Sequence, residues 1–182
     1  MITVHLDLAN AYEQACMAPS DIYVHLPALY RYASCCRHVT EFGVRTGVST
    51  LAFLRAVPER LISYDLNRSP EVDQLEELAR LQNINFTFRQ EDTRCAEIEP
   101  TDLLFIDTFH EREHIEAELA TSGGKVSRYL IFHDTETFGE HGEGGGEGIW
   151  PAIAAFLRRE PSWCLLYHRP ENHGLTVLYR SG

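Results

Sequence analysis

A short stretch with two glycines, residues 39–50, constrains the fold of this chain more than any other segment. Its apolar start ends at Glu41, Gly43 and Gly47 follow four residues apart, and Ser49-Thr50 opens a helix-spaced apolar segment. This order predicts a buried strand, a tight turn, and a helix whose first N–H groups face a ligand. Glu41 lies where the strand ends, the usual place for ligand groups in open α/β sheets. We therefore expect the carboxyl edge of a sheet to bind a nucleotide-like small molecule.

The spacing of the glycines narrows the kind of nucleotide site. A dinucleotide fingerprint needs glycine where this chain has Arg45 and Val48. A phosphate-binding P-loop needs Gly-Lys-Ser/Thr, which the sequence does not contain. Both pyrophosphate-type motifs are therefore disfavoured. A turn that binds nothing remains an alternative at this point.

Composition excludes several classes of partner. The chain has 182 residues and a net charge of −11, so we expect one domain that avoids nucleic acid and anionic membranes. The five cysteines have no CxxC spacing, and no apolar run of about 18 residues occurs. These features predict a protein of the reduced cytoplasm.

Apolar periodicity predicts alternating strands and helices after residue 38. Helical patterns cover 7–17, the segment from Pro27, 48–56, 71–79, 111–120 and 149–157, and strand patterns cover 39–41, 61–65, 84–89, 103–106, 129–132, 163–169 and 175–180. We expect Ser69 to cap the helix that begins at Pro70. The glycine-rich residues 140–148 are expected to form a flexible loop. This alternation predicts an α/β fold with a mostly parallel, doubly wound sheet that ends in an antiparallel hairpin.

The pattern acid-x-Gly-x-x-x-Gly at 41–47 resembles the first motif of class I S-adenosylmethionine-dependent methyltransferases. The patterns at 107–110, 131–135 and 172–178 resemble the group often placed with cephalosporin hydroxylases and with macrolide-sugar and rhamnosyl O-methyltransferases. The resemblance runs from about residue 39 to 180. It implies a Rossmann-like, seven-stranded, mostly parallel sheet with one antiparallel strand, formed by a methyltransferase-like domain (39–182) behind an N-terminal helical extension (1–38).

The resemblance also implies roles for residues at the strand ends. Gly43 and Gly47 would flank the methionine part of S-adenosylmethionine, and Glu41 would help hold its ammonium group. Asp65 would accept the two ribose hydroxyls, since an ionised carboxylate is an acceptor for several donors. Asp92 would lie near the adenine amino group. Asp65 alone does not discriminate between cofactors, because a nicotinamide ribose would suit it too.

A second group of residues follows the fourth and fifth expected strands. Related enzymes bind a divalent metal such as Mg or Mn with acids here, which implies Asp107, His133 and Asp134 as ligands. His133 stands where an acid is usual, and imidazole suits softer ions than Mg²⁺. His110 is the candidate general base, with Asp107 beside it. In the alternative, His133 and Asp134 only cap a strand and position the substrate.

The sequence thus predicts a methyltransferase, with S-adenosylmethionine as cofactor and a divalent metal as assistant, that O-methylates a small hydroxylated metabolite such as a sugar or natural product. A metal-dependent oxygenase that uses His110, His133 and either Asp107 or Asp134 is one alternative. A non-catalytic cofactor-binding protein is another. We also expect homo-oligomers, by analogy with relatives.

Overall fold

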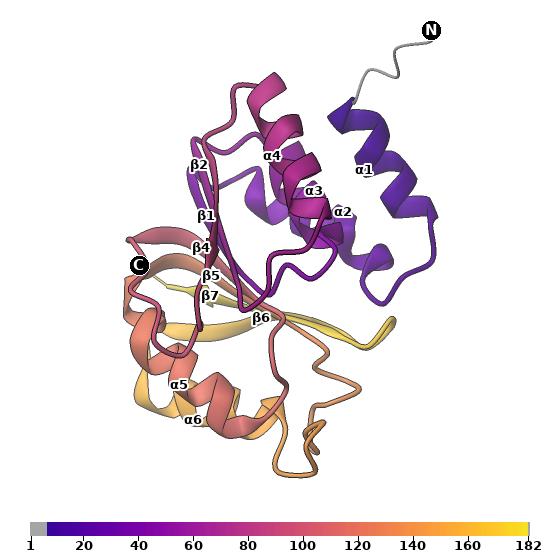
Figure 1. The fold of residues 1–182 in the computed structure, drawn as a ribbon. Coiled ribbons are helices and arrows are strands. Elements are labelled where there is room, and N and C mark those ends of the chain that lie inside the picture. The colour runs from indigo at the N-terminus through magenta and orange to yellow at the C-terminus, as the bar shows by residue number, and fades with distance from the viewer. Residues whose placement is uncertain (1–6, 182) are drawn as a thin grey trace, which may run out of the picture.

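The computed structural model describes residues 7–181 and folds them into a central sheet with helices on both faces (Figure 1). The seven strands lie in the order β3-β2-β1-β4-β5-β7-β6. The strands are β1 (His38–Phe42), β2 (Arg60–Asp65), β3 (Phe86–Gln90), β4 (Thr101–Ile106), β5 (Val126–His133), β6 (Trp163–Arg169) and β7 (Leu175–Arg180). The helices are α1 (Leu8–Met17), α2 (Leu26–Ala33), α3 (Val48–Arg55), α4 (Glu71–Leu81), α5 (Arg112–Ser122) and α6 (Ile149–Arg159), with 3-10 turns η1 (Tyr23–His25) and η2 (Gly123–Lys125).

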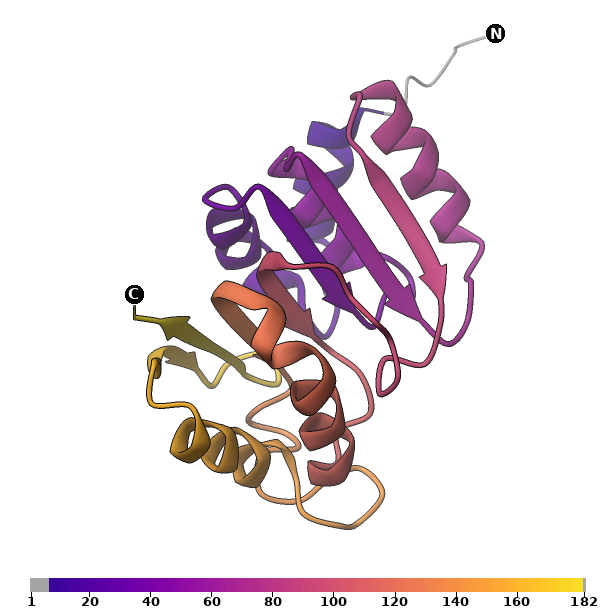
Figure 2. The same ribbon diagram turned by 90° about the vertical axis from the view of Figure 1, so that its left-hand side faces the viewer.

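The strand pairing confirms the predicted fold. β1 lies between β2 and β4 and runs parallel to both, while β3 and β5 extend the sheet in parallel on either side. β7 pairs antiparallel with both β5 and β6, so it is the one antiparallel strand among those described. Figure 2 shows the parallel strands ending at one edge, where the turn after β1 and the loops after β2, β3 and β4 gather.

Both faces of the sheet are covered, which explains why the central strands are continuously apolar. In β4, Leu103 and Phe105 face the core under α1–α4, and Leu104 and Ile106 face the core under α5 and α6. Figure 1 shows these two helical layers on opposite sides of the sheet. Among residues 7–181, none of the helices combines the length and apolar character that a membrane crossing requires.

The helices of the expected extension 1–38 pack directly on the sheet layer. Leu26 and Leu29 of α2 share one core with Phe53 and Leu54 of α3. Asp7 caps α1 by accepting a hydrogen bond from the N–H of Ala9 at 3.0 Å. Residues 1–6 of the expected extension lie outside the described residues. The segment between α1 and α2, which reaches the carboxyl edge of the sheet, is therefore held at both ends by helices that pack in this core.

One helix start differs from its prediction. α4 begins at Glu71, and no side chain caps it. The Ser69 hydroxyl is buried without a partner, and the Ser69 carbonyl instead accepts from the Val72 N–H at 3.1 Å. The prediction that Ser69 caps the helix through its side chain was wrong, because the backbone turn supplies the contact.

Candidate active site

Two adjoining cavities open at the carboxyl edge of the sheet. The β2–β3 cavity, of about 250 Å³, is lined by Gly43, Arg45, Asp65, Leu66, Asn67, Asp92, Thr93, Asp107, Thr108, Phe109 and His114. The β4–β5 cavity, of about 190 Å³, is lined by Asp21, Ile22, Gly43, Val44, Arg45, Thr46, Val48, Ser49, Asp107, Thr108, His110, Asp134 and Glu143. The two share the glycine turn and the end of β4, so one elongated molecule can span both.

The glycine turn between β1 and α3 is held tightly against the rest of the chain. Gly43 has φ +87°, and a Cβ there would lie 1.9 Å from the carbonyl oxygen of Asp107. Gly47 has φ +76°, and its Cβ would meet Leu75 at 2.4 Å. Both positions need glycine for backbone conformation and for internal packing. The sequence interpretation had assigned these glycines to the approach of a ligand, and Gly43 does line both cavities.

Glu41 is fully buried behind that turn. Its carboxylate accepts hydrogen bonds from the hydroxyls of Ser49 (2.6 Å), Thr50 (2.8 Å) and Ser63 (2.5 Å). Burial raises the pKa of Glu41 to about 7, against the opposing effect of these three hydrogen bonds. Glu41 therefore ties the first turn of α3 to β2. It lies outside the lining of both cavities, and its predicted contact with an ammonium group stays a prediction.

Asp65 ends β2 and faces the β2–β3 cavity. One of its oxygens accepts from the N–H groups of Val44 and Arg45, at 2.8 and 2.9 Å. The other accepts from the Asn67 N–H at 2.9 Å. A carboxylate offers about four acceptor positions, so capacity for a ligand hydroxyl remains. The same contacts hold the glycine turn against the end of β2.

Asp92 follows β3 and lines the same cavity. Its carboxylate pairs with the Arg94 guanidinium at 2.6 Å. The hydrogen bonds from Arg94 lower the pKa of Asp92 to about 2. Asp92 therefore stays ionised as an acceptor at the far end of the cavity from the glycine turn.

Glu118 of α5 contacts three residues that line this cavity, and sequence reasoning missed its role. It is fully buried and accepts from the hydroxyls of Thr93 (2.5 Å) and Thr108 (3.0 Å), with His114 Nε2 at 3.2 Å. These three partners line the cavity. The only hint in the sequence is the i,i+4 spacing of His114 and Glu118 on one helix face. Glu118 thus joins the loops after β3 and β4.

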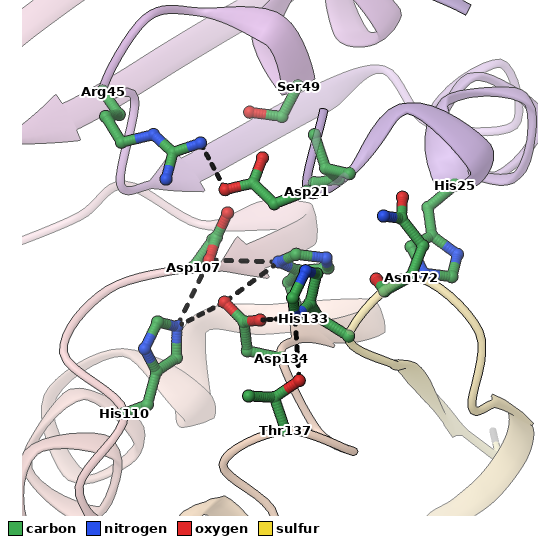
Figure 3. Close-up of polar contacts among 12 residues, drawn as sticks. Asp21, His25, Arg45, Ser49, Asp107, His110, His133, Asp134, Thr137 and Asn172 are labelled. Carbon is green, nitrogen blue, oxygen red and sulfur yellow. Dashed lines mark hydrogen bonds and ion pairs between the residues drawn. The ribbon is translucent and has the colours of Figure 1, made fainter. Parts of the chain in front are cut away.

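Asp107 and Asp134 meet between two histidines at the ends of β4 and β5 (Figure 3). His110 Nε2 lies 3.0 Å from Asp134 Oδ2 and 3.4 Å from Asp107 Oδ1. His133 Nδ1 lies 3.3 Å from each of the same two oxygens. The structure thus brings together the four residues that the sequence singled out here. We call them the His-Asp cluster.

The charges of the His-Asp cluster balance within it. Burial lowers the pKa values of His110 and His133, but hydrogen bonds and charge from Asp107 and Asp134 outweigh burial and raise both to about 10. Burial raises the pKa of Asp134, and its contacts with the two histidines outweigh this effect and lower it. Two imidazolium groups therefore neutralise two carboxylates at neutral pH.

The donor set of the cluster fits a divalent metal. In the part of the chain that the structure describes, Asp107, His110 and Asp134 each offer a ligand atom, all within 4.8 Å of one another. Two carboxylate oxygens and one imidazole nitrogen suit Mn²⁺, Fe²⁺ or Zn²⁺ better than Mg²⁺. Metal binding would release the proton of His110, since imidazole ligates in its neutral form. The sequence had placed His133 in this set and His110 as a base.

The chain between α1 and α2 closes the β4–β5 cavity, and sequence reasoning missed its contribution. Asp21 forms an ion pair with Arg45 of the glycine turn. Asn172 of the β6–β7 turn binds this segment through the Ser20 carbonyl (2.9 Å) and the Val24 N–H (3.3 Å). These contacts join residues about 150 positions apart in the chain. No periodicity in the sequence indicates them.

His25 lies behind His133, with its Nε2 group 2.9 Å from the Glu171 carbonyl. The two imidazole rings are edge to face at 5.6 Å between centroids. Burial lowers the pKa of His25, so its ring is neutral. His133 is therefore fixed on one side by carboxylates and on the other by a neutral ring.

Comparison with known proteins agrees with this geometry. No family model matches the chain, and no curated protein matches it. Among solved structures, an O-methyltransferase from Bacillus cereus in complex with SAH is 14% identical, with a TM-score of 0.65 over 99% of this chain and 94% of that one. The O-methyltransferase TomG from Streptomyces achromogenes, in complex with SAM, is 17% identical, with a TM-score of 0.61 over 100% and 93%. A methyltransferase from Geobacter sulfurreducens is 16% identical, with a TM-score of 0.64 over 96% and 89%. The chain therefore has the fold of these methyltransferases, as its sequence resemblance implied.

Proposed function

We propose that this protein is an S-adenosylmethionine-dependent methyltransferase that O-methylates a small hydroxylated metabolite. One observation carries the proposal: Asp65 and Asp92 line a cavity that continues past Gly43 into a second cavity, which is lined by Asp107, His110 and Asp134 of the His-Asp cluster. This is the order of groups that a nucleoside joined to an amino acid would need. Two solved structures with this fold, the O-methyltransferases from Bacillus cereus and Streptomyces achromogenes, are complexes with SAH and SAM.

The β2–β3 cavity would hold the adenosine part of the cofactor. Asp65 would accept from the ribose hydroxyls, and Asp92 from the adenine amino group. Leu66 and Phe109 offer apolar surface for the adenine faces, being 58% and 48% exposed. The two carboxylates would repel a pyrophosphate, so a dinucleotide cofactor is less well supported.

The β4–β5 cavity would hold the methionine part of the cofactor, between Gly43 and Ser49, together with the acceptor. Asp21, Asp107, Asp134 and Glu143 give this cavity an acidic lining that Arg45 and His110 only partly balance. An anionic acceptor would be repelled by such a lining. A neutral polyol, sugar or natural-product hydroxyl therefore suits it better.

Methyl transfer requires alignment and removal of one proton. The acceptor oxygen attacks the methyl carbon, the carbon–sulfur bond breaks, and the sulfur keeps the electron pair. Asp107 would take the hydroxyl proton, a contribution of typically about 10² to 10⁴ in rate, and His110, an imidazolium at neutral pH, would act as the predicted base only after losing its own proton. Asp107, His110 and Asp134 would hold a divalent metal, which when bound lowers the pKa of a ligated hydroxyl. His133 would then fix the orientation of the two carboxylates.

The oxygenase alternative receives less support. It needs two histidines and one carboxylate around the metal, and the group that meets the distance requirement in the described residues has one histidine and two carboxylates. It also leaves Asp65 and Asp92 without a ligand.

Isothermal titration calorimetry with S-adenosylhomocysteine tests the proposal directly. We expect binding in the micromolar range with one site per chain, and weaker or no binding of NAD⁺. Absence of S-adenosylhomocysteine binding at millimolar ligand would contradict the proposal. A screen of sugars and polyketide-like alcohols with methyl-labelled cofactor would then identify the acceptor.

We also propose that the protein works in the cytoplasm. The five cysteines are free, at Cys16, Cys35, Cys36, Cys95 and Cys164, as expected in a reducing compartment. Homo-oligomerisation remains a prediction that sedimentation of the purified protein would test.

A further inference from the structure

The glycine-rich segment 140–148 is an ordered collar around one carboxylate. Glu111 Oε1 accepts from the N–H of Gly144 at 2.6 Å and from that of Gly146 at 3.4 Å. Within the segment, His141 and Glu147 form an antiparallel bridge. We expected a flexible loop here from the sequence; the segment makes specific contacts with Glu111, and its mobility stays a prediction.

The glycines of the collar make room for Glu111. A Cβ at Gly142, Gly144 or Gly146 would lie 2.5, 2.7 and 2.4 Å from atoms of the Glu111 carboxyl group. A Cβ at Gly145, by contrast, would meet no atom within 4 Å. Three of the glycines therefore serve close packing around the half-buried Glu111.

A second anchor comes from the next residue of the chain. The Arg112 N–H donates to the Glu147 carbonyl at 2.8 Å, and its guanidinium donates to the Glu147 carboxylate at 2.6 Å. Glu111 and Arg112 together open α5, a helix packed into the core. The collar is thus fixed to a rigid element at two points.

The fixed collar places Glu143 on His110. Glu143 Oε1 accepts from the His110 backbone N–H at 3.0 Å and lies 3.1 Å from the ring Nδ1. Phe138 stacks on the same ring, at 4.9 Å between centroids and 12° between planes. With Nδ1 held by Glu143, the other nitrogen, Nε2, is directed at Asp134 and Asp107.

We propose that Glu143 is a positioning residue that fixes the His110 ring with Nδ1–H toward the collar and Nε2 toward Asp107 and Asp134. A carboxylate on the far nitrogen of an imidazole is a common way to set its tautomer and orientation. His110 Nε2 then faces the two carboxylates, where it would ligate a metal once it has lost its proton. The use of this nitrogen in catalysis rests on the proposed function, whereas its orientation does not.

Nitrogen-15 NMR of the histidine rings tests the orientation without any ligand. We expect a His110 Nδ1–H signal in slow exchange in the wild type, assigned by its loss in His110→Asn. Glu143→Ala should abolish it, and Glu143→Gln, which keeps an acceptor oxygen, should retain it in part. Glu140→Gln is the matched control, since Glu140 is exposed in the same collar and is not among the described contacts of His110. An unchanged signal in Glu143→Ala would overturn the proposal.

Titration with Mn²⁺ alone gives a second readout. We expect Glu143→Ala to weaken Mn²⁺ binding by about 10- to 100-fold, with Glu140→Gln close to the wild type. Equal Mn²⁺ affinity in Glu143→Ala and wild type would count against the positioning role, and if the wild type binds no Mn²⁺ the ring spectrum decides alone. S-adenosylhomocysteine affinity should stay within about twofold of the wild type in Glu140→Gln, since Glu140 lies outside the lining of both cavities. If the wild type does not bind S-adenosylhomocysteine, the proposed function is refuted, whereas the NMR result on the orientation of the His110 ring still stands.

Discussion

The carboxylates at the carboxyl edge of the sheet have different partners in its two halves, the ends of β1–β3 and the ends of β4 and β5. Around the ends of β1, β2 and β3, Glu41 and Asp65 accept hydrogen bonds from hydroxyl and backbone N–H groups. Around the ends of β4 and β5, Asp107 and Asp134 are surrounded by imidazole rings. Fixed dipoles thus stabilise Glu41 and Asp65, whereas groups that exchange protons neutralise Asp107 and Asp134. The difference is consistent with the proposed function, in which the first half would hold the cofactor and the second would carry out the chemistry.

Gly43→Ala should have the largest effect, because Gly43 lines both cavities and lies where the two halves meet. The new Cβ would lie 1.9 Å from the Asp107 carbonyl oxygen in a backbone with φ +87°. We expect S-adenosylhomocysteine binding to become undetectable by calorimetry and the melting temperature to fall. Gly145→Ala is the control, because its φ of +91° carries the same strain with no atom within 4 Å, at a cost of about 1 kcal/mol. If Gly43→Ala binds S-adenosylhomocysteine like the wild type, the ligand does not pass Gly43 from one cavity to the other.

Asp134→Asn tests whether the halves are separable. The variant removes a charge from the group formed by Asp107, His110 and Asp134. We expect Mn²⁺ affinity to fall by at least about 100-fold, since a lost carboxylate ligand leaves only two strong donors. Methyl transfer to any acceptor found by screening should fall with it, while S-adenosylhomocysteine affinity stays within about threefold. The separation of the two halves would be contradicted if the wild type does not bind Mn²⁺. It would also be contradicted if Asp134→Asn loses S-adenosylhomocysteine binding together with Mn²⁺ binding.

Asp65→Ala makes the converse test on the ligand-holding half. It removes the acceptor for ribose and also the contacts to the Val44 and Arg45 N–H groups. A charged hydrogen bond is worth about 1.5–3 kcal/mol, so we expect S-adenosylhomocysteine affinity to fall by roughly 10- to 150-fold. Mn²⁺ affinity should not change. Asp73→Asn provides a control carboxylate, exposed and paired only with Arg68. Calorimetry that finds Asp65→Ala equal to this control would remove Asp65 from the site.

The fold was predictable from sequence because the central strands are buried on both faces. The apolar runs at 103–106 and 129–132 gave their strands directly, and the acid after each run marked the site edge. Glu118, Asp21 and Glu143 were not predictable, because their respective partners Thr93, Arg45 and His110 lie 24 to 33 residues away in the sequence.

The glycine-rich segment has a packing role that composition alone does not reveal. Many glycines in sequence indicate flexibility, but here they create space for Glu111. Only the fold reveals which residue fills that space. The same holds for His110, whose role follows from the position of Glu143.

Glu41→Gln should have the smallest effect and bears on the claim that fixed dipoles stabilise Glu41 in the ligand-holding half. Burial raises the pKa of Glu41 to about 7 in the folded protein, above the ordinary value of 4.5 that applies to the unfolded chain. The folded state therefore holds this proton more tightly, so the contribution of Glu41 to stability is complete below pH 4.5 and is lost as the pH rises to 7. We expect the free energy of unfolding of the wild type to fall, relative to Glu41→Gln, by about 2 kcal/mol between pH 5 and pH 6.5. Urea unfolding at several pH values measures this difference, with the exposed Glu97→Gln as the matched control. If the pH dependence of the unfolding free energy is the same in the wild type and in Glu41→Gln, Glu41 is ionised throughout this pH range. The hydrogen bonds from the three hydroxyl groups then outweigh the effect of burial on its pKa.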